Sequence, residues 1–249
     1  MKKIFLILFF IPTFLFSQEL SNFLPTNNGE LAHHTYYSLS YSEQYEQAEW
    51  VFYEIKKERV LGLVSRKNNF RSDNSVSTNS ATLSDYKGSG FDRGHLAPAH
   101  DFSFDKDAMS ESFYMSNMSP QNPSFNRGIW GNLESLVRSW GTNSSIYVVT
   151  GPIVDDCSTT IGTNNVCVPE YYYKVIYDPL KQKMISFILP NEKGTKNLNE
   201  YVCTTDSLEK ITNIDFFPVL EDNLEEKLES EIHKEFWTGM LSSEYYHHD

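Results

Sequence analysis

The chain has 249 residues, 40% of them hydrophobic, which is enough apolar material for one large domain or two small ones and argues against wholesale disorder. Lys and Arg number 21 and Asp and Glu number 33, so the formal net charge is −12. A surface this acidic argues against a protein that coats nucleic acid or an anionic membrane by bulk charge, but it leaves room for a local basic site.

The N-terminus has the pattern of a secretory signal peptide. Lys2 and Lys3 precede an apolar run from Ile4 to Phe16, and the small residue Ser17 follows. This run is too short for a comfortable bilayer span, and no later stretch reaches about 18 uninterrupted apolar residues. We therefore expect a signal peptide at 1–17 and a secreted or periplasmic mature protein; a retained N-terminal anchor is the alternative.

The first half of the mature chain is dominated by a strand and a long loop. Residues 18–249 contain no linker, repeat or low-complexity tract, which predicts a single domain with its core at about 49–220. Residues 49–55 alternate partly and carry aromatic residues, so a strand is expected there. Residues 65–90 are rich in Ser, Asn, Asp and Gly and predict a long surface loop, a feature that is often functional.

The second half mixes strand and helix patterns. Strands are predicted at 112–118, 145–150, 170–177 and 183–189. Helices are predicted at 126–140, 197–211 and 221–236, and the last of these holds much of the acidity. Because strands and helices follow no regular alternation, the fold class is expected to be α+β.

Three cysteines are compatible with a disulfide in an exported protein. Cys157 and Cys167 flank a segment with Gly and Asn, so a local bridge would leave Cys203 over. A bridge from Cys203 to either of the others stays open.

The strongest chemical signal is Asp92-Arg93-Gly94-His95. The imidazole of His95 can take a proton near neutral pH, and the planar guanidinium of Arg93 suits phosphate oxygens. Asp92 could orient either neighbour, and Gly94 permits a tight backbone. The alternative is a surface turn with a local ion pair.

Two further motifs follow this one. Asn117 and Gln121, in Ser116-Asn117-Met118-Ser119-Pro120-Gln121, could bind a phosphate or a metal-bound water, or could simply belong to a turn. In the predicted helix, polar side chains are spaced by four beside an apolar stripe. This row consists of Asn126, Trp130, Glu134 and Arg138, and it places a carboxamide, a carboxylate and a guanidinium on one flank of the helix. The alternative is a solvated Glu134–Arg138 ion pair, with Asn126 as a helix cap.

These motifs, in this order over about residues 91–140, resemble the DNA/RNA non-specific endonuclease family. The resemblance implies a ββα-metal (His-Me finger) site in an α+β domain with a central, mostly antiparallel sheet flanked by helices. It also implies a metal-dependent phosphodiester hydrolase whose substrates are DNA and RNA, contacted through the phosphate backbone. A protein that only binds nucleic acid or another partner, and a phosphodiesterase for small nucleotides, are the alternatives.

The resemblance also assigns roles to single residues. His95 matches the general base, Asn126 the single protein ligand of a hydrated Mg²⁺ (with Mn²⁺ as a substitute), and Glu134 the acid that binds the metal's waters. The remaining assignments are Asn117 as a support of the base and substrate geometry, Arg93 as a phosphate-side cation and Arg138 as a supporting arginine.

The family also uses an arginine upstream of the histidine motif. Arg66 and Arg71 both lie in that region, and Arg66 is slightly favoured. The window 66–93 is net positive within an acidic chain and is expected to form a phosphate-binding rim, with chance clustering on a solvated loop as the alternative. Its cations are Arg66, Lys67, Arg71, Lys87 and Arg93.

Overall fold

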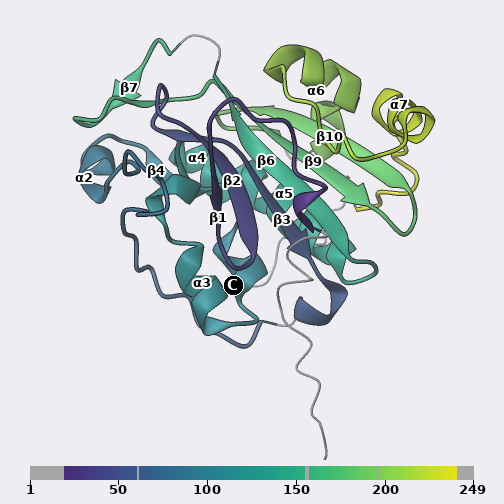
Figure 1. The fold of residues 1–249 in the computed structure, drawn as a ribbon, viewed down its shortest axis with the longest axis horizontal. Coiled ribbons are helices and arrows are strands. Elements are labelled where there is room, and N and C mark those ends of the chain that lie inside the picture. The colour runs from purple at the N-terminus through teal and green to yellow at the C-terminus, as the bar shows by residue number, and fades with distance from the viewer. Residues whose placement is uncertain (1–19, 61, 155–156, 196, 240–249) are drawn as a thin grey trace, which may run out of the picture.

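A computed structural model describes residues 20–60, 62–154, 157–195 and 197–239. Its centre is a seven-stranded antiparallel sheet with the strand order β1-β2-β3-β6-β9-β10-β11 (Figure 1). These strands are β1 (Glu30–His33), β2 (Tyr37–Ser42), β3 (Gln47–Ile55), β6 (Ile146–Ile153), β9 (Tyr171–Asp178), β10 (Lys183–Pro190) and β11 (Val202–Cys203).

The central strands bury side chains on both faces of the sheet. Alternate residues of a strand point to opposite faces, so Tyr53 and Ile176 enter one core cluster while Phe52 and Val175 enter another. Strands buried on both faces need apolar side chains at almost every position, and β-branched and aromatic residues fill them well. This explains why the sequence runs for β3, β6, β9 and β10 were recognisable.

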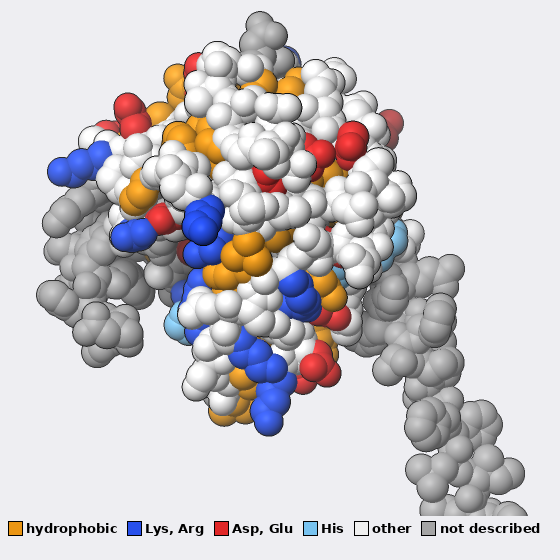
Figure 2. Space-filling view, turned by 90° about the vertical axis from the view of Figure 1, so that its left-hand side faces the viewer, with side chains coloured by type: hydrophobic (Ala, Val, Ile, Leu, Met, Phe, Trp, Pro, Cys, Tyr) orange, Lys and Arg blue, Asp and Glu red, His pale blue; other side chains and the backbone are white. Residues whose placement is uncertain are grey.

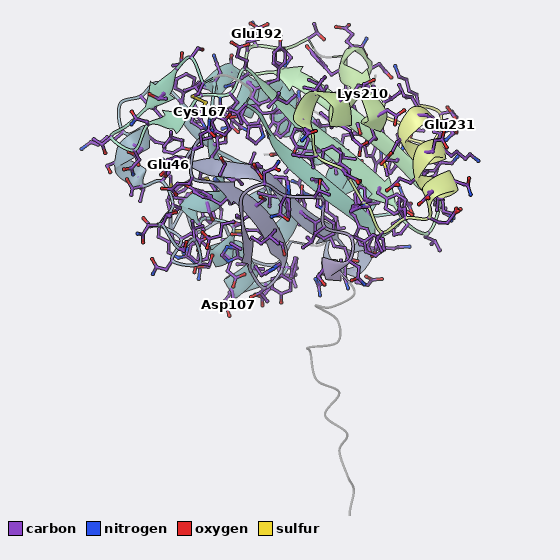
Figure 3. All side chains as sticks on the ribbon, turned by 45° about the horizontal axis from the view of Figure 1, so that its top comes forward. Glu46, Asp107, Cys167, Glu192, Lys210 and Glu231 are labelled. Atoms are coloured by element: carbon purple, nitrogen blue, oxygen red, sulfur yellow. A yellow bond between two sulfur atoms is a disulfide. The ribbon has the colours of Figure 1, made fainter. Side chains whose placement is uncertain are left out.

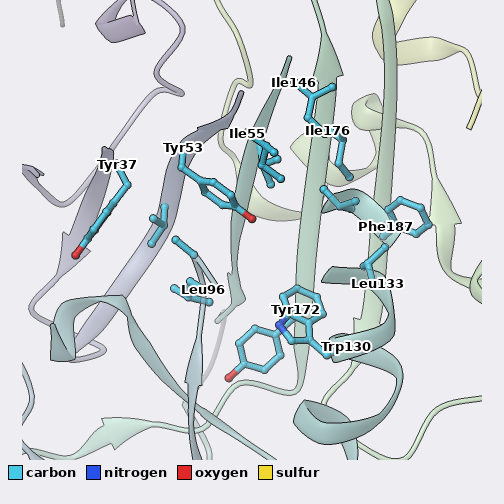
Figure 4. Packing of buried hydrophobic residues seen from close by; sticks show 14 of the residues in the cluster. Tyr37, Tyr53, Ile55, Leu96, Trp130, Leu133, Ile146, Tyr172, Ile176 and Phe187 are labelled. Atoms are coloured by element: carbon cyan, nitrogen blue, oxygen red, sulfur yellow. The ribbon is translucent and has the colours of Figure 1, made fainter. Parts of the chain in front are cut away.

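Helices cover each face of the sheet. On one face lies α5 (Gly131–Gly141), and Figure 4 shows Trp130 and Leu133 beside Tyr172 and Phe187 of the sheet. On the other face, α6 (Thr205–Thr212) and α7 (Asp222–Ser230) lie side by side over β10 (Figure 1). The candidate functional residues lie with α5, on the first of these faces.

Short elements complete the described chain. A separate two-stranded sheet pairs β4 (Asp92–His95) with β5 (Met118–Gln121), and a hairpin pairs β7 (Thr160–Ile161) with β8 (Val166–Cys167). The short α-helices are α2 (Leu83–Tyr86), α3 (Lys106–Glu111) and α4 (Pro123–Phe125). The 3₁₀-helices are η1 (Lys57–Arg59), η2 (Ala99–Phe102), η3 (Met115–Asn117) and η5 (Leu198–Tyr201), and η4 (Asn126–Trp130) is a short π-helix.

The α+β class with a central antiparallel sheet is confirmed, as are the strands predicted at 49–55, 145–150, 170–177 and 183–189. The strand predicted at 112–118 is wrong. That segment contains the 3₁₀-helix η3, and the strand begins only at Met118. Phe113 and Met115 are both buried but in different apolar clusters, so their alternation reflects two small cores rather than the two faces of a sheet.

The predicted helices are shorter than their periodicity suggested. The segment 126–140 is a regular helix only from Gly131, because Gly128 adopts φ −112° and ψ −115°, outside the helical range. Within 197–211, Val202–Cys203 pairs with β10 instead, and α6 starts after the capping side chain of Thr204. Within 221–236, the helix ends at Ser230.

The disulfide joins Cys157 to Cys167 and leaves Cys203 as a free thiol. Figure 3 shows Cys167 at the end of the molecule that carries the β7–β8 hairpin. The predicted signal peptide at 1–17 lies outside the described residues. Among the residues that are described, no helix combines the length and apolarity needed to cross a bilayer.

Candidate active site

The histidine motif forms strand β4, which pairs with β5. Asp92 lies opposite Gln121, and His95 lies opposite Met118. A side chain at Gly94 would come within 2.1 Å of the fully buried Gln121, so this close pairing requires glycine. Because the side chain of Gln121 is fully buried against Gly94, it is not available to a phosphate.

His95 lies in an aromatic recess with one nitrogen unpaired. Its ring meets Phe113 edge-on at 4.9 Å between centroids and Phe70 at 5.8 Å. The residue is 8% exposed, and its Nε2 has no hydrogen-bond partner among the described residues. Burial, followed by the charges of Arg66 and Arg93, lowers the pKa of His95 to about 3. The imidazole is therefore neutral at physiological pH, and it is a weak base as long as both arginine charges are uncompensated.

Asn117 holds the segment that follows His95. Its Oδ1 accepts a hydrogen bond from the amide of Ala97 at 2.9 Å, and its Nδ2 donates to the carbonyls of Ala97 and Ser112, each at 2.9 Å. The amide of Leu96 donates to the carbonyl of Asn117 at 3.0 Å. Since Asn117 is fully buried and its side chain makes these three bonds, it can fix the position of His95 but does not reach a substrate.

Two of the predicted arginines flank His95, each on one of its aromatic neighbours. The guanidinium of Arg93 lies 4.3 Å from the ring centroid of Phe70, and that of Arg66 lies 4.9 Å from the centroid of Phe113. Both residues are exposed, so their charges are accessible to an anion.

Arg71 has a different environment from Arg66. It donates hydrogen bonds to the carbonyls of Asn69 and Ser110 and lies 3.8 Å from the ring centroid of Tyr114. Its guanidinium thus anchors the long loop. Of the two upstream candidates, Arg66 is the one that the structure brings beside His95.

The face that carries α2, α3 and β4 shows the expected local positive charge. In Figure 2, Lys and Arg side chains gather over the middle and lower part of this face, with Asp and Glu side chains above and beside them. A cavity of about 440 Å³ lies beside the motif and is lined by Tyr86, Lys87, Phe91, Asp92 and Arg93 together with Leu83, Ser84 and Gly88. It therefore combines aromatic surface with two cations.

Asn126 is held in place by the first residue of the motif. Its Nδ2 donates to Oδ2 of Asp92 at 2.9 Å, and Arg127 binds the same carboxylate through two nitrogens at 2.8 and 2.6 Å. Burial acts to raise the pKa of Asp92, but these hydrogen bonds outweigh it and lower the pKa. With Nδ2 engaged, Oδ1 is the Asn126 atom available to a cation.

The residues around Asn126 suit a hard divalent cation. The free Oδ1 of Asn126 and the carboxylate of Asp92 beside it are oxygen donors, which Mg²⁺ prefers. Mg²⁺ commonly keeps several waters and takes only one or two protein ligands, which matches a sparse donor set. These donors therefore suit the kind of hydrated cation that the family resemblance implies.

Glu134 lies in the first turn of α5 and is partly buried. Burial raises the pKa of Glu134 to about 7, and the positive charges of Lys174 and Arg138 oppose this rise. The alternative view of Arg138 as its partner in a solvated ion pair is wrong. Arg138 instead donates to Asp101 at 2.5 Å, in a pair whose side chains are 14% and 2% exposed.

Lys174 is a charged residue that sequence reasoning missed. It lies in the middle of β9 and is fully buried, and its Nζ has no hydrogen-bond partner among the described residues. The Nζ lies 4.8 Å from the ring centroid of Trp130. Burial lowers the pKa of Lys174 to about 8, while Glu134 and Asp101 act to raise it. The sequence feature that could have revealed it is a single lysine within a predicted strand of aromatic and β-branched residues.

Comparisons with known proteins agree with this geometry. The family model of the DNA/RNA non-specific endonucleases matches residues 18–223. The mitochondrial nuclease EXOG of Mus musculus is 34% identical over 220 residues, covering 79% of this chain and 59% of the relative. Nuclease C1 of Cunninghamella echinulata var. echinulata is 37% identical over 205 residues, covering 74% of this chain and 81% of the relative.

The human mitochondrial endonuclease G is 35% identical over 203 residues, covering 73% of this chain and 67% of the relative. A solved structure described as the EndoG/EndoGI complex superposes with a TM-score of 0.75 at 29% identity, covering 86% of this chain and 95% of that chain. The chain spans about three fifths of the length of the mouse EXOG nuclease. On the family match and these identities, the chain belongs to the DNA/RNA non-specific endonuclease family.

Proposed function

We propose that this protein is an exported endonuclease that hydrolyses phosphodiester bonds in DNA and RNA and depends on Mg²⁺, with Mn²⁺ as a substitute. The observation that carries the proposal is the environment of His95: a neutral, unpaired Nε2 between two accessible arginines and close in sequence to an Asp92–Asn126 pair. A base, two anion-binding groups and a cation-binding amide are what phosphodiester hydrolysis requires.

In this proposal, His95 is the general base. Nε2 removes a proton from a water molecule, whose oxygen attacks phosphorus while the bond to the leaving oxygen breaks. Base catalysis of this kind contributes about 10²–10⁴-fold to a rate. The low pKa of His95 is set partly by Arg66 and Arg93, and a bound phosphodiester would neutralise these charges. Substrate binding should therefore raise the pKa of His95 and make it a stronger base.

Arg93 and Arg66 would bind the phosphate and stabilise the charge that develops on phosphorus. Guanidinium groups fixed on aromatic rings need little rearrangement when the reaction proceeds. Asn117 contributes by fixing the backbone after His95, and Arg138 contributes by fixing Asp101 beneath the helix that carries Glu134. Both are positioning residues.

Asn126 would hold the Mg²⁺ ion through Oδ1, with Glu134 and Asp92 binding its water ligands. When bound, the ion supplies electrostatic stabilisation of the leaving 3′ oxygen. The chain itself prepares this position, because Asp92 fixes the Asn126 amide and Arg127 fixes Asp92.

We expect cleavage of both DNA and RNA, without regard to sequence, because the proposed contacts are confined to phosphates. Nothing in the proposed set of residues reads base edges or the 2′ hydroxyl, and backbone contacts carry no sequence information. The basic face around Arg66, Lys87 and Arg93 would supply affinity through counterion release, so cleavage should weaken steeply as salt rises.

We also propose that residues 1–17 direct export and that 18–249 form one domain, so that the mature enzyme works outside the cytoplasm. The Lys-flanked apolar segment at 4–16 supports this, and the family match begins at residue 18. Cell fractionation, with sequencing of the mature N-terminus, would test it. Recovery of the full-length chain in the cytoplasm would rule out export.

The decisive experiment is cleavage of supercoiled plasmid and structured RNA by the chain from Gln18 onward. We expect nicking and degradation of both substrates in Mg²⁺, loss of activity in EDTA, and at least a 100-fold loss in His95→Ala. His100→Ala is the matched control, since this second histidine is exposed and should leave cleavage unchanged.

Two other outcomes would redirect the interpretation. If folded wild-type protein binds plasmid but cleaves nothing in Mg²⁺, Mn²⁺ or Ca²⁺, the protein is a binder and the proposal fails. If it hydrolyses a dinucleotide much faster than a long duplex, the activity is that of a small-nucleotide phosphodiesterase.

A further inference from the structure

A second cluster of charges lies between α6 and α7, on the face of the sheet opposite α5. Figures 1 and 3 show these two helices side by side. Five carboxylates converge there in two groups that share Glu229, and within each group one oxygen per residue lies within 4.8 Å of the others. The first group is Asp206, Glu209 and Glu229, and the second is Asp215, Glu225 and Glu229.

The spacing of these acids shows that they share faces of their helices. Asp206 and Glu209 are three apart on α6, and Glu225 and Glu229 are four apart on α7. Like charges at such spacings destabilise a helix. None of the ion pairs found among the described residues joins a Lys, Arg or His to any of the five acids.

A second, separate observation points to a missing ligand. Glu229 is only 6% exposed, and its Oε1 is buried without a hydrogen-bond partner among the described residues. Its carboxylate belongs to both groups, so it points into the cluster. Oε1 of Glu225 is likewise buried and unpaired. Buried acceptors normally have a donor or a cation, and no Lys, Arg or His of the described residues forms an ion pair with either oxygen.

We propose that α6 and α7 hold one divalent cation, Ca²⁺ in preference to Mg²⁺, with Glu229 as the central ligand. Oxygens that bind one Ca²⁺ at about 2.3–2.6 Å lie no more than roughly 5 Å apart, which fits both groups. Carboxylates from two helices and the turn at Asp215 form an irregular set. Ca²⁺ accepts such sets with six to eight oxygens, whereas Mg²⁺ demands nearly octahedral geometry.

Protons are the competing occupant. Glu209 and Glu229 lie close enough to hydrogen-bond each other once one is protonated, and burial together with the neighbouring acids raises the pKa of Glu229 to about 9. A bound Ca²⁺ would displace these protons and fasten α6 to α7. The proposed site is structural and separate from the active site, so it stands whether or not the chain is a nuclease.

The test is calorimetric titration of Ca²⁺ into metal-free Asn126→Ala protein, which removes the proposed active-site ligand. We expect one Ca²⁺ per chain, and a rise in Tm of about 5 °C or more at a Ca²⁺ concentration 100 times Kd. Mg²⁺ at the same concentration should give a smaller shift.

Two variants in the same background assign the ion to this cluster. Glu229→Gln should abolish the binding heat and the shift in Tm, whereas Glu226→Gln, an exposed acid on the same helix, should leave both unchanged. If Glu229→Gln does not fold, the exposed Asp215→Asn should still weaken Ca²⁺ at least tenfold. Absence of Ca²⁺ binding by folded Asn126→Ala protein, or binding equal in Glu229→Gln, would overturn the proposal.

Discussion

Two clusters of charge, each with buried members, lie on opposite faces of the same sheet, and they are neutralised in different ways. The cluster beside α5 mixes signs, because Lys174 and Arg138 accompany Glu134 and Asp101. The cluster between α6 and α7 consists only of carboxylates. Burial therefore has to be offset by the chain's own cations in the first cluster, and by protons or a cation from solution in the second.

The mixed cluster and the carboxylate cluster affect folding in different ways. A mixed cluster is complete as soon as the chain folds, so it can hold the helix that carries Glu134 in one position before a substrate arrives. A cluster of one sign makes folding depend on pH and on dissolved cations. The substitutions below test whether this distinction is real, and all of them are to be measured in EDTA.

The largest effect is expected for Lys174→Met, which keeps the length of the side chain but removes its charge. Removing one member of a buried charge cluster costs about 3 kcal/mol, because it leaves the opposite charges uncompensated. Urea unfolding would measure the loss. Lys181→Met, at an exposed position beyond β9, is the control and should stay within about 0.5 kcal/mol of the wild type. Unchanged stability of Lys174→Met would mean that Lys174 does not balance the acids.

A smaller loss is expected for Asp101→Asn, which keeps a hydrogen-bond acceptor for Arg138 but removes the negative charge. A hydrogen bond to a charged group contributes roughly 1.5–3 kcal/mol, so a destabilisation of about 2 kcal/mol is expected. The exposed Asp107→Asn should be nearly neutral. Equal effects of the two substitutions would show that the buried Asp101–Arg138 pair adds nothing.

Stability without metal should fall as pH rises from 6 to 9. The pKa values of Glu209 and Glu229 are raised from 4.5 to about 7 and about 9, so the folded state holds protons that the unfolded state has released. Their contribution is complete below pH 4.5 and is lost as pH passes these values. We expect a loss of about 1 kcal/mol or more, the equivalent of one unit of pKa. Thermal unfolding across this range would measure it, and flat stability would contradict it.

The smallest effect is expected for Glu229→Gln, and it has the opposite sign to the three losses above. At pH 9 in EDTA, the neutral amide relieves repulsion among the remaining acids, so a gain of about 1 kcal/mol is expected, shrinking toward zero at pH 6. Destabilisation at pH 9 comparable to that of Lys174→Met would show that the two clusters do not differ in kind.

Much of the framework was predictable from local sequence. Strands β3, β6, β9 and β10 were found because they are rich in β-branched and aromatic residues, which favour strands. The histidine motif and the residues around Asn126 identified the family, because the chemistry requires those side chains close together in a fixed order. The disulfide between Cys157 and Cys167 was one of the pairings that the sequence left open, and it could be proposed because a local loop needs no knowledge of the fold.

Only the tertiary structure decided which charges meet. Spacing along the chain offered Glu134 as the partner of Arg138, but folding brought Asp101 there from a turn 37 residues earlier. Lys174 likewise meets Trp130, which precedes α5 in the sequence, only in the folded chain. Glu229 meets carboxylates from α6 and from the turn at Asp215 only there as well. Periodicity reports which face of an element is buried, whereas pairing and pKa depend on which segments the fold brings together.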